Sequence, residues 1–404
     1  MTRRAGTTGT SRDPYGLGPA GTYVAPAIAG LALVIVAAIT LSLMNGQVPF
    51  HGGSNGPGTQ PGPNRTPAPS NQVIVEPSVT FAGSIVYAKA GNVWVQTGNA
   101  ARQLTNSGLD SMPSFSPDGQ WVYFIRVQVG KGLHPLNGRL TWYDLATPEI
   151  ARVKTDGSAK PEQIVTGRIK SGKSTWFSWM REPVLGPDGH TVALVSDGPD
   201  PSKSEVVLQF YDLTSKKFTK PKLSAADLGH QDPAWEPLGR YVAFVKNGRD
   251  GSRGAPQIVK YNPENGRSFA VTGPGYLAPS WSPDTKYLAA TKTDSFGTNV
   301  AILDANTGAE LLRVTNDGAS FSPVWSPAGD AIAFLHLEGM IVDLRMVKLE
   351  GSAGSWTVGD AINLTEVSGL DAASRPGWFI PPGEMPAGTA PPSGSGSSSA
   401  SPAP

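Results

Sequence analysis

Residues 167–174, "GRIKSGKS", match the phosphate-binding pattern G-x-x-x-x-G-K-[ST] at every fixed position. In such a loop the backbone N–H groups surround the phosphates, the lysine contacts their outer oxygens and the hydroxyl binds Mg²⁺. Gly167, Gly172, Lys173 and Ser174 would have these roles. The chemistry also needs a strand before the loop and a helix that begins at its end, so the neighbouring elements decide whether nucleotide binding is expected.

Other catalytic patterns receive no support from the sequence. The G-x-S-x-G match at 52–56 lies in a stretch of Gly, Pro, Asn and Ser rather than between a strand and a helix, so no serine peptidase domain of that type is expected. The five histidines have neither H-E-x-x-H nor any other ligand spacing, and we therefore expect neither a metal site nor a cofactor. They are His51, His134, His190, His230 and His336.

Composition excludes several classes of protein. The chain has 404 residues, with 33 Lys+Arg against 32 Asp+Glu. Such near neutrality argues against a nucleic-acid-binding protein, which needs excess positive charge to neutralise phosphates. The absence of cysteine excludes disulfides, thiolate metal ligands and a cysteine nucleophile. The 48 Gly and 37 Pro predict many turns.

An apolar segment at residues 23–44 has the length of a membrane span. Its 22 residues contain no charge and, as a helix, would cross a hydrocarbon core of about 30 Å. Arg3, Arg4 and Arg12 precede it, while the next 20 residues contain no Lys or Arg. The positive-inside rule therefore predicts a cytoplasmic tail at 1–22, a signal-anchor in the cell membrane and an extracytoplasmic remainder. A cleaved signal peptide is the alternative, but the apolar run is longer than usual and no A-x-A site follows it.

Two further segments, 45–72 and 381–404, consist mainly of Gly, Pro, Ser, Thr, Ala and Asn. They cannot bury enough apolar surface to fold. We predict a disordered linker and a disordered tail, with a folded domain over 73–380.

One sequence unit recurs within this domain, as in "PSFSPDGQWVYF" and "PVWSPAGDAIAF". An apolar strand, a tight turn and a second strand follow one another, and Pro and Gly in the turn favour its φ angles. The copies begin at Pro113, Pro183, Pro233, Pro279 and Pro323, at intervals of 70, 50, 46 and 44 residues. Strand-rich repeats of 40 to 50 residues are typical of β-propeller blades.

A second element recurs later in each unit. Turn-forming residues at Asp144, Asp212, Asn262 and Asp304 are expected to end a third strand and start a fourth. Each fourth strand ends in a threonine, at Thr105, Thr166, Thr272, Thr315 and Thr365. Four strands make one propeller blade.

The two ends of the domain complement each other. "RPGWF" at 375–379 has Trp378 in the position of a first strand, and residues 84–105 provide strands two to four. Together they complete a sixth blade and leave no free sheet edge in the ring. The sequence thus predicts an all-β, six-bladed β-propeller of four-stranded blades, preceded by one transmembrane helix and a disordered linker; seven blades are the alternative.

The repeats P-x-[WF]-S-P-D-G that end in L-T are similar to those of the TolB propeller family and its relatives. The resemblance covers residues 73–380. It implies the propeller fold, and related propellers scaffold protein contacts, bind saccharides or gate peptidases. TolB has a small α/β domain where this sequence has a membrane anchor and spacer, so the resemblance carries over only the fold and the role of an interaction platform.

Repeated aspartates and tryptophans are assigned structural roles. The turn aspartates are expected to accept N–H groups of their own turns rather than bind calcium, and the tryptophans to pack between blades rather than stack on sugars. These residues are Asp118, Asp188, Asp284, Trp235, Trp281, Trp325 and Trp378.

The blade pattern also decides the "GRIKSGKS" question. Thr166 ends one blade and Pro183 begins the next, and only eight residues separate Ser174 from Pro183. A phosphate-binding loop needs a longer helix there, so the match is attributed to chance and no nucleotide partner is expected.

Two long connections in the first two blades predict a partner-binding surface. The 167–182 loop is expanded relative to the other inter-blade connections, and the 126–139 segment has only positive charges. Both are expected on the same face, where long loops on a rigid scaffold tend to bind. The alternative is that they only cover the seam between two blades. The predicted binding residues are Arg168, Lys170, Lys173, Trp176, Trp179, Lys131 and Arg139.

These observations favour a non-enzymatic, membrane-anchored, extracytoplasmic propeller that binds a protein or an anionic envelope polymer. One alternative is a polysaccharide hydrolase or lyase that uses the central channel, which would need carboxylates or histidines converging there. The other is a transmembrane sensor.

Overall fold

The computed structural model describes residues 72–386, except 78, 137, 202–204, 224–227, 248–255, 296 and 353. The predicted cytoplasmic tail (1–22), the membrane segment (23–44), residues 45–71 of the linker and residues 387–404 of the tail lie outside the described residues. None of the helices in the described part has the length and hydropathy of a membrane span.

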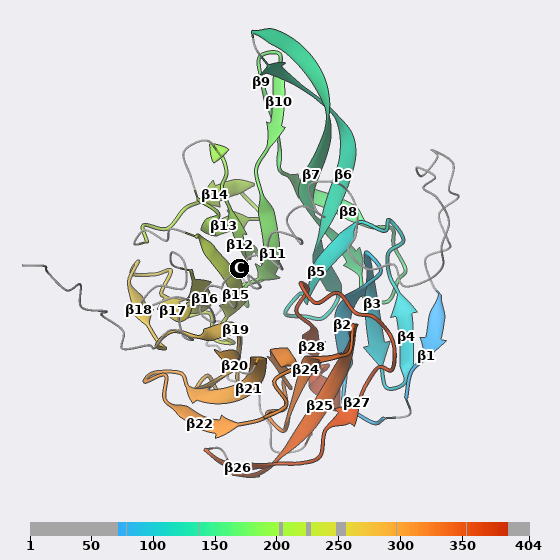
Figure 1. Ribbon diagram of the computed structural model, residues 1–404, viewed down its shortest axis with the longest axis vertical. Coiled ribbons are helices and arrows are strands. Elements are labelled where there is room, and N and C mark those ends of the chain that lie inside the picture. The colour runs from blue at the N-terminus through green and yellow to red at the C-terminus, as the bar shows by residue number, and fades with distance from the viewer. Residues whose placement is uncertain are drawn as a thin grey trace, which may run out of the picture. The chain divides into compact units, whose positions relative to one another are not determined.

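The described residues form six antiparallel blades arranged in a ring (Figure 1), which confirms the predicted propeller and its blade number. Blades 1 to 4 each have four strands in sequential order. Blade 1 contains β5 (Asp110–Phe115), β6 (Trp121–Leu136), β7 (Arg139–Lys154) and β8 (Glu162–Thr166). Blade 2 contains β11 (Met180–Leu185), β12 (Thr191–Ser196), β13 (Val207–Asp212) and β14 (Lys217–Thr219). Blade 3 contains β15 (His230–Trp235), β16 (Val242–Lys246), β17 (Gln257–Tyr261) and β18 (Ser268–Ala270). Blade 4 contains β19 (Tyr276–Trp281), β20 (Tyr287–Asp294), β21 (Gly297–Asp304) and β22 (Glu310–Arg313).

Blades 5 and 6 have additional strands. Blade 5 contains β23 (Ser320–Trp325), β24 (Ala331–Glu338), β25 (Ile341–Ser352), β26 (Ser355–Val358) and β27 (Ile362–Asn363). Both β26 and β27 pair with β25. Blade 6 contains β28 (Gly377–Phe379), β2 (Ser84–Lys89), β3 (Asn92–Thr97), β4 (Ala100–Gln103) and β1 (Val73–Val75), in that order.

Blade 6 closes the ring with strands from both ends of the domain, as predicted. Ile85 of β2 lies opposite Trp378 of β28 in the antiparallel register. The Trp378 indole also donates a hydrogen bond to the Ala82 carbonyl at 2.9 Å. The outermost strand β1, paired with β4, was not predicted.

The core lies between neighbouring blades, because both faces of a central strand are covered. On β20, Leu288 and Ala290 pack toward Val245 of blade 3, whereas Ala289 packs toward Ile332 of blade 5. Trp281 lies in the first of these clusters and Trp325 in the second. The predicted inter-blade role of these two tryptophans is confirmed.

The turns after the innermost strands have the predicted chemistry. The Asp118 carboxylate accepts the Gln120 N–H, and that of Asp188 accepts the Thr191 N–H. Asp284 accepts the Lys286 N–H in the same way. The turn aspartates therefore have the structural role expected of them.

One expected turn position is wrong. Asp144 lies within β7 of blade 1 and pairs with Lys131 of β6, so it does not start the fourth strand. That strand is β8, which begins at Glu162 after a turn in which Gly157 has a φ of 70°. The physical reason is that β6 and β7 extend far beyond their blade neighbours, which displaces the turn along the sequence.

Candidate functional site

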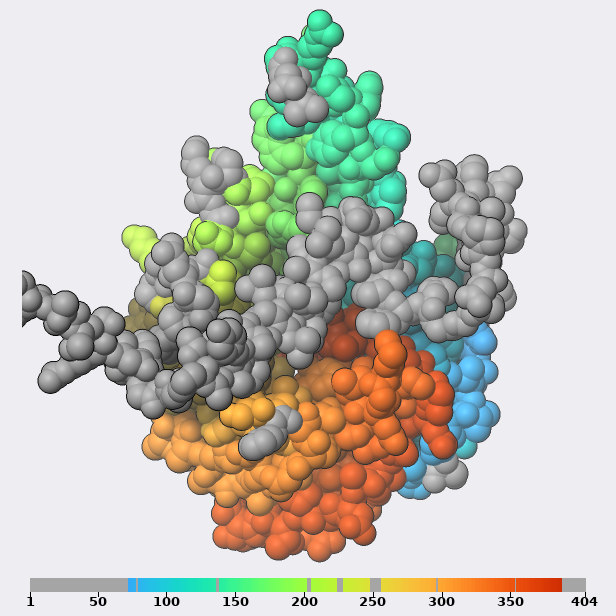
Figure 2. Space-filling model, viewed as in Figure 1, coloured from blue at the N-terminus to red at the C-terminus, as the bar shows by residue number. Residues whose placement is uncertain are grey.

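The two predicted binding loops are β-hairpins rather than irregular loops. Strands β6 and β7 pair over their full length, from Trp121 opposite Lys154 to Leu136 opposite Arg139. Because β5 pairs with β6 only as far as Arg126, residues 128–147 form a ribbon that extends beyond the blade. In the 167–182 connection, β9 (Arg168–Ser171) and β10 (Ser174–Phe177) form a second hairpin. We call the ribbon and the second hairpin the arm (Figures 1 and 2).

"GRIKSGKS" comprises Gly167, strand β9, the turn of this second hairpin and the first residue of β10. Gly172 has a φ of 56° in the turn, and β10 begins at Ser174 where a phosphate-binding loop would start a helix. The segment therefore lacks the strand-loop-helix context of a nucleotide site, in agreement with the sequence prediction.

Side chains join the two hairpins of the arm. The Arg168 guanidinium donates a hydrogen bond to the Lys131 carbonyl at 2.7 Å, and the Tyr143 hydroxyl donates one to the Thr175 carbonyl. Gly132 leaves room for the Tyr143 ring, since a Cβ there would lie 2.7 Å from the ring. The structure thus brings the two predicted loops together on one face.

The predicted binding residues separate into two groups. Lys170, Lys173 and Arg139 are exposed and form no ion pair with another described residue. Lys131 is also exposed but pairs with Asp144 at 2.5 Å, a contact that solvent weakens.

The other predicted residues help to build the arm. Arg168, Trp176 and Trp179 are half-buried. The Trp176 ring lies 6.5 Å from that of His134, which places it between the two hairpins. The Trp179 ring packs edge-on against Phe177 at 5.2 Å. These aromatic rings pack within the protein and stabilise the arm, so only part of their surface is free to contact a partner.

Sequence reasoning missed the apolar residues that the ribbon exposes. Trp142 is 67% exposed, Val129 66% and Leu140 44%. A tryptophan that is mostly exposed is unusual away from binding surfaces. The sequence did indicate an insertion here, because the 70-residue interval between Pro113 and Pro183 exceeds the other intervals between repeats by 20 residues or more.

The central channel contains a pocket of about 490 Å³, lined by the innermost strands of all six blades. In five of these strands the residue before the first proline of the repeat has a positive φ, and the strand bulges there. These residues are Met112, Glu182, Asp232, Ala278 and Ser322. Of the five, Met112 and Glu182 line the pocket.

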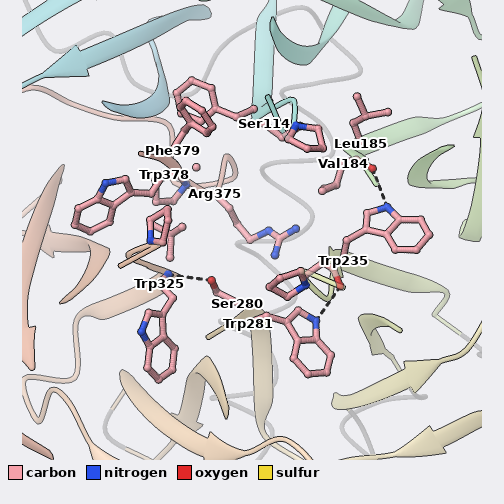
Figure 3. Close-up of a pocket in the computed structure, with 18 of the residues that line it drawn as sticks. Ser114, Val184, Leu185, Trp235, Ser280, Trp281, Trp325, Arg375, Trp378 and Phe379 are labelled. Atoms are coloured by element: carbon pink, nitrogen blue, oxygen red, sulfur yellow. Dashed lines mark hydrogen bonds between the residues drawn. The ribbon is translucent and has the colours of Figure 1, made fainter. Parts of the chain in front are cut away.

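Arg375 occupies the corresponding position in blade 6 and extends across the channel (Figure 3). Its guanidinium donates to the Pro233 carbonyl of blade 3 at 2.8 Å and to the Pro279 carbonyl of blade 4 at 3.2 Å. Its Nε atom lies 3.5 Å from the Asp232 carboxylate. The arginine therefore bridges the last blade to blades on the other side of the ring.

Both channel carboxylates near Arg375 hold backbone groups. Glu182 accepts the Asp232 N–H, and Asp232 in turn accepts the Ala278 N–H. Burial raises the pKa of Glu182, as does the charge of Asp232, while Arg181 and Arg375 act in the opposite direction. Burial is the largest of these effects, so the pKa of Glu182 lies above its ordinary value.

A second cluster of chemical groups lies in blade 5. The Ser320 hydroxyl donates to Asp317 at 2.7 Å and lies 3.1 Å from His336 Nδ1. The same His336 nitrogen lies 3.3 Å from Asp317. A catalytic triad needs serine and aspartate on different ring nitrogens, so this cluster does not have that geometry. Among the described residues, no group of His, Asp and Glu side chains could hold a metal ion.

Solved structures share this architecture. TolB from Acinetobacter baumannii matches with a TM-score of 0.52 at 20% identity, over 73% of this chain and 66% of that chain. The fold is that of the TolB propeller. This TolB-like propeller is also similar to a putative TolB from Agrobacterium tumefaciens, with a TM-score of 0.48, 14% identity and coverage of 74% of this chain and 94% of that chain. An oligogalacturonate lyase from Vibrio parahaemolyticus matches with a TM-score of 0.42, 14% identity and coverage of 69% and 98%.

The match to the Acinetobacter protein confirms the resemblance at the level of the fold. The chain spans just under two thirds of the Acinetobacter protein. No protein-family profile matches the sequence. At such low identity the shared fold carries no activity or partner with it, so function has to be argued from the arm and the channel.

Proposed function

We propose that this protein is a non-enzymatic binding platform whose arm docks an acidic partner, either a protein or an anionic polymer of the cell envelope. From the apolar segment at 23–44 we further propose that it is held in the cell membrane with the propeller on the extracytoplasmic side. The linker at 45–72 would then separate the propeller from the membrane surface.

The composition of the arm supports the proposal. Exposed, unpaired cations lie at Lys170, Lys173 and Arg139, and Trp142 adds an exposed aromatic anchor close to Arg139 in the ribbon. Cations steer an acidic partner, and a tryptophan that becomes buried on contact provides much of the affinity. A rigid β-ribbon, held by the Tyr143 and Arg168 hydrogen bonds, loses little entropy on binding.

The channel favours an enzymatic function less. No histidine lines the described part of the pocket, and the carboxylates of Glu182 and Asp232 already accept backbone N–H groups. A general acid or base must reach its substrate with a free oxygen or nitrogen. We therefore do not propose hydrolase or lyase chemistry there.

The test compares two triple variants of the full chain in detergent. The arm variant carries Lys170→Ser, Lys173→Ser and Arg139→Ser, and the matched control removes three exposed cations elsewhere, Lys217→Ser, Lys222→Ser and Arg267→Ser. Binding is measured to poly-L-glutamate as a defined acidic polymer and by capture from an envelope extract. We expect a loss of at least tenfold in the arm variant and a much smaller change in the control, with Trp142→Ser reducing capture further. Equal losses in both triple variants would refute a specific role of the arm.

A further inference from the structure

The channel pocket opens on the face opposite the arm. The pocket is lined by the turns that join first and second strands, whereas the arm consists of a second-to-third-strand connection and an inter-blade connection. Because successive strands in a blade are antiparallel, these two kinds of connection lie at opposite ends of the blade. A ligand in the pocket would therefore not compete directly with a partner on the arm.

Proline rings form much of the pocket wall. One comes from each first-to-second-strand turn of blades 1 to 5, namely Pro117, Pro187, Pro237, Pro283 and Pro327. Proline has no backbone N–H, so this wall offers apolar surface and few donors. Glu236 also lines the pocket, but it is 2% exposed and its carboxylate is paired with Arg240 at 2.6 Å. We call this pocket, with Arg375 in its lining, the proline cup.

The Arg375 guanidinium lies in the cup, and the protein accepts only some of its N–H groups (Figure 3). Of its five N–H groups, one is donated to Pro233 and one to Pro279, and the Nε group faces Asp232 at 3.5 Å. The remaining two have no acceptor among the described residues. Buried or half-buried guanidinium donors favour a carboxylate, which can accept two of them at once.

The neighbouring charges do not cancel this preference. Asp232 is occupied by the Ala278 N–H, and its distance from Nε is longer than a hydrogen bond. The Glu182 carboxylate accepts the Asp232 N–H and lies 3.5 Å from Arg181, so it too is held by groups other than Arg375.

We propose that the proline cup binds a small carboxylate with an apolar body. The guanidinium of Arg375 holds the carboxylate, and the proline rings contact the body. The volume of about 490 Å³ is within the range of small-molecule sites, and few polar groups in an apolar pocket are sufficient to orient a ligand.

The experiment titrates the full chain in detergent with benzoate and hexanoate, and with benzamide and hexanamide as uncharged probes of the same shape. Binding is followed by calorimetry and by ligand-observed NMR. We expect saturable binding of at least one acid, and affinity for its amide at least tenfold lower, because the amide cannot form the charge-assisted pair. Apolar probes also enter micelles, so each titration is repeated on the Arg375→Met variant, in which micelle partition is the same and specific binding is expected to be lost.

A second variant keeps the test valid if Arg375→Met does not fold. Val184 lines the pocket and is half-buried, so Val184→Phe reduces the cup without altering the arginine. We expect it to weaken acid binding at least tenfold while the circular dichroism spectrum stays unchanged. The proposal is overturned if neither acid binds, if an amide binds as tightly as its acid, or if binding persists in Val184→Phe or in a folded Arg375→Met protein.

Discussion

Replacing Trp281 with phenylalanine should destabilise the propeller more than the same change at Trp325. The two residues occupy the same repeat position in adjacent blades and are similarly buried, at 7% and 4% exposure. The Trp281 indole donates to the Ala234 carbonyl of the preceding blade at 3.1 Å, whereas the Trp325 indole N–H is buried without a partner among the described residues. The pair therefore isolates the hydrogen bond from the loss of ring volume.

The magnitude follows from this difference. Both substitutions remove the same apolar atoms, so the volume contributions largely cancel. Trp281→Phe loses a hydrogen bond worth about 1 kcal/mol and leaves the Ala234 carbonyl without this donor. In the folded protein the unpaired Trp325 N–H carries a desolvation cost of about 1–3 kcal/mol, and Trp325→Phe removes this cost. We expect the free energy of unfolding to be lower in Trp281→Phe than in Trp325→Phe by about 2–4 kcal/mol, the sum of these two contributions.

The assay is equilibrium urea unfolding of the full chain in detergent, followed by far-ultraviolet circular dichroism. An unchanged slope with urea would show that the variants expose the same surface on unfolding. Trp235→Phe is the matched third variant, since its indole donates to the Val184 carbonyl at 3.1 Å, and it should behave like Trp281→Phe. If Trp325→Phe is as destabilising as the other two at equal slope, the inter-blade hydrogen bonds contribute nothing and the reasoning is wrong.

Two further predictions concern pH and backbone conformation. Burial, together with nearby lysines, lowers the pKa of His230 to about 4 from 6.5, so the unfolded chain takes up a proton first and the free energy of unfolding should fall as pH drops from about 6.5 to about 4. His230→Asn keeps an acceptor for the Leu208 N–H and should flatten this slope in thermal denaturation between pH 7 and pH 4.5; an unchanged slope would contradict the assignment. Gly297→Ala should lower the free energy of unfolding by several kcal/mol, because the new Cβ would lie 2.0 Å from the Gly318 carbonyl. Gly172→Ala should lower it by about 1 kcal/mol, since no atom lies within 4 Å of its Cβ and only the positive φ is unfavourable. Similar urea midpoints for the two alanine variants would show that crowding at Gly297 is not decisive.

The blades could be predicted because each copy of the repeat contains its own turn chemistry. The Asp118 turn, for example, is specified by Pro, Asp and Gly within four residues, and the contacts that stabilise it are local. Blade 6 could be predicted because each end of the domain contains an incomplete repeat. Residues 84–105 supply strands two to four without a first strand, and residues 375–379 supply a first strand alone. Turn residues and repeated patterns of this kind can be recognised in a single sequence.

The arm was located by length and charge but not by its structure. Most of the described residues of the ribbon are exposed, so apolar and polar residues do not alternate along it as they do in a blade strand. Residues 128–147 also contain glycines and a proline, which normally interrupt strands. Strand β1 has only three residues, too few for a pattern. The partners of Arg375 were inaccessible for a different reason, because they are backbone carbonyls 96 and 142 positions away that no side-chain pattern marks.

The pairing of β28 with β2 also affects how the protein can be made. The hydrogen bond from Trp378 to Ala82 spans 296 positions, and closing a loop of that length costs about 5 kcal/mol of chain entropy. Folding dominated by such distant contacts is slow. During synthesis, β2 emerges early but has no neighbour on its inner side until β28 has been added. A growing chain therefore presents an unpaired β2 edge for most of its elongation time, and protection of that edge becomes a requirement for correct assembly.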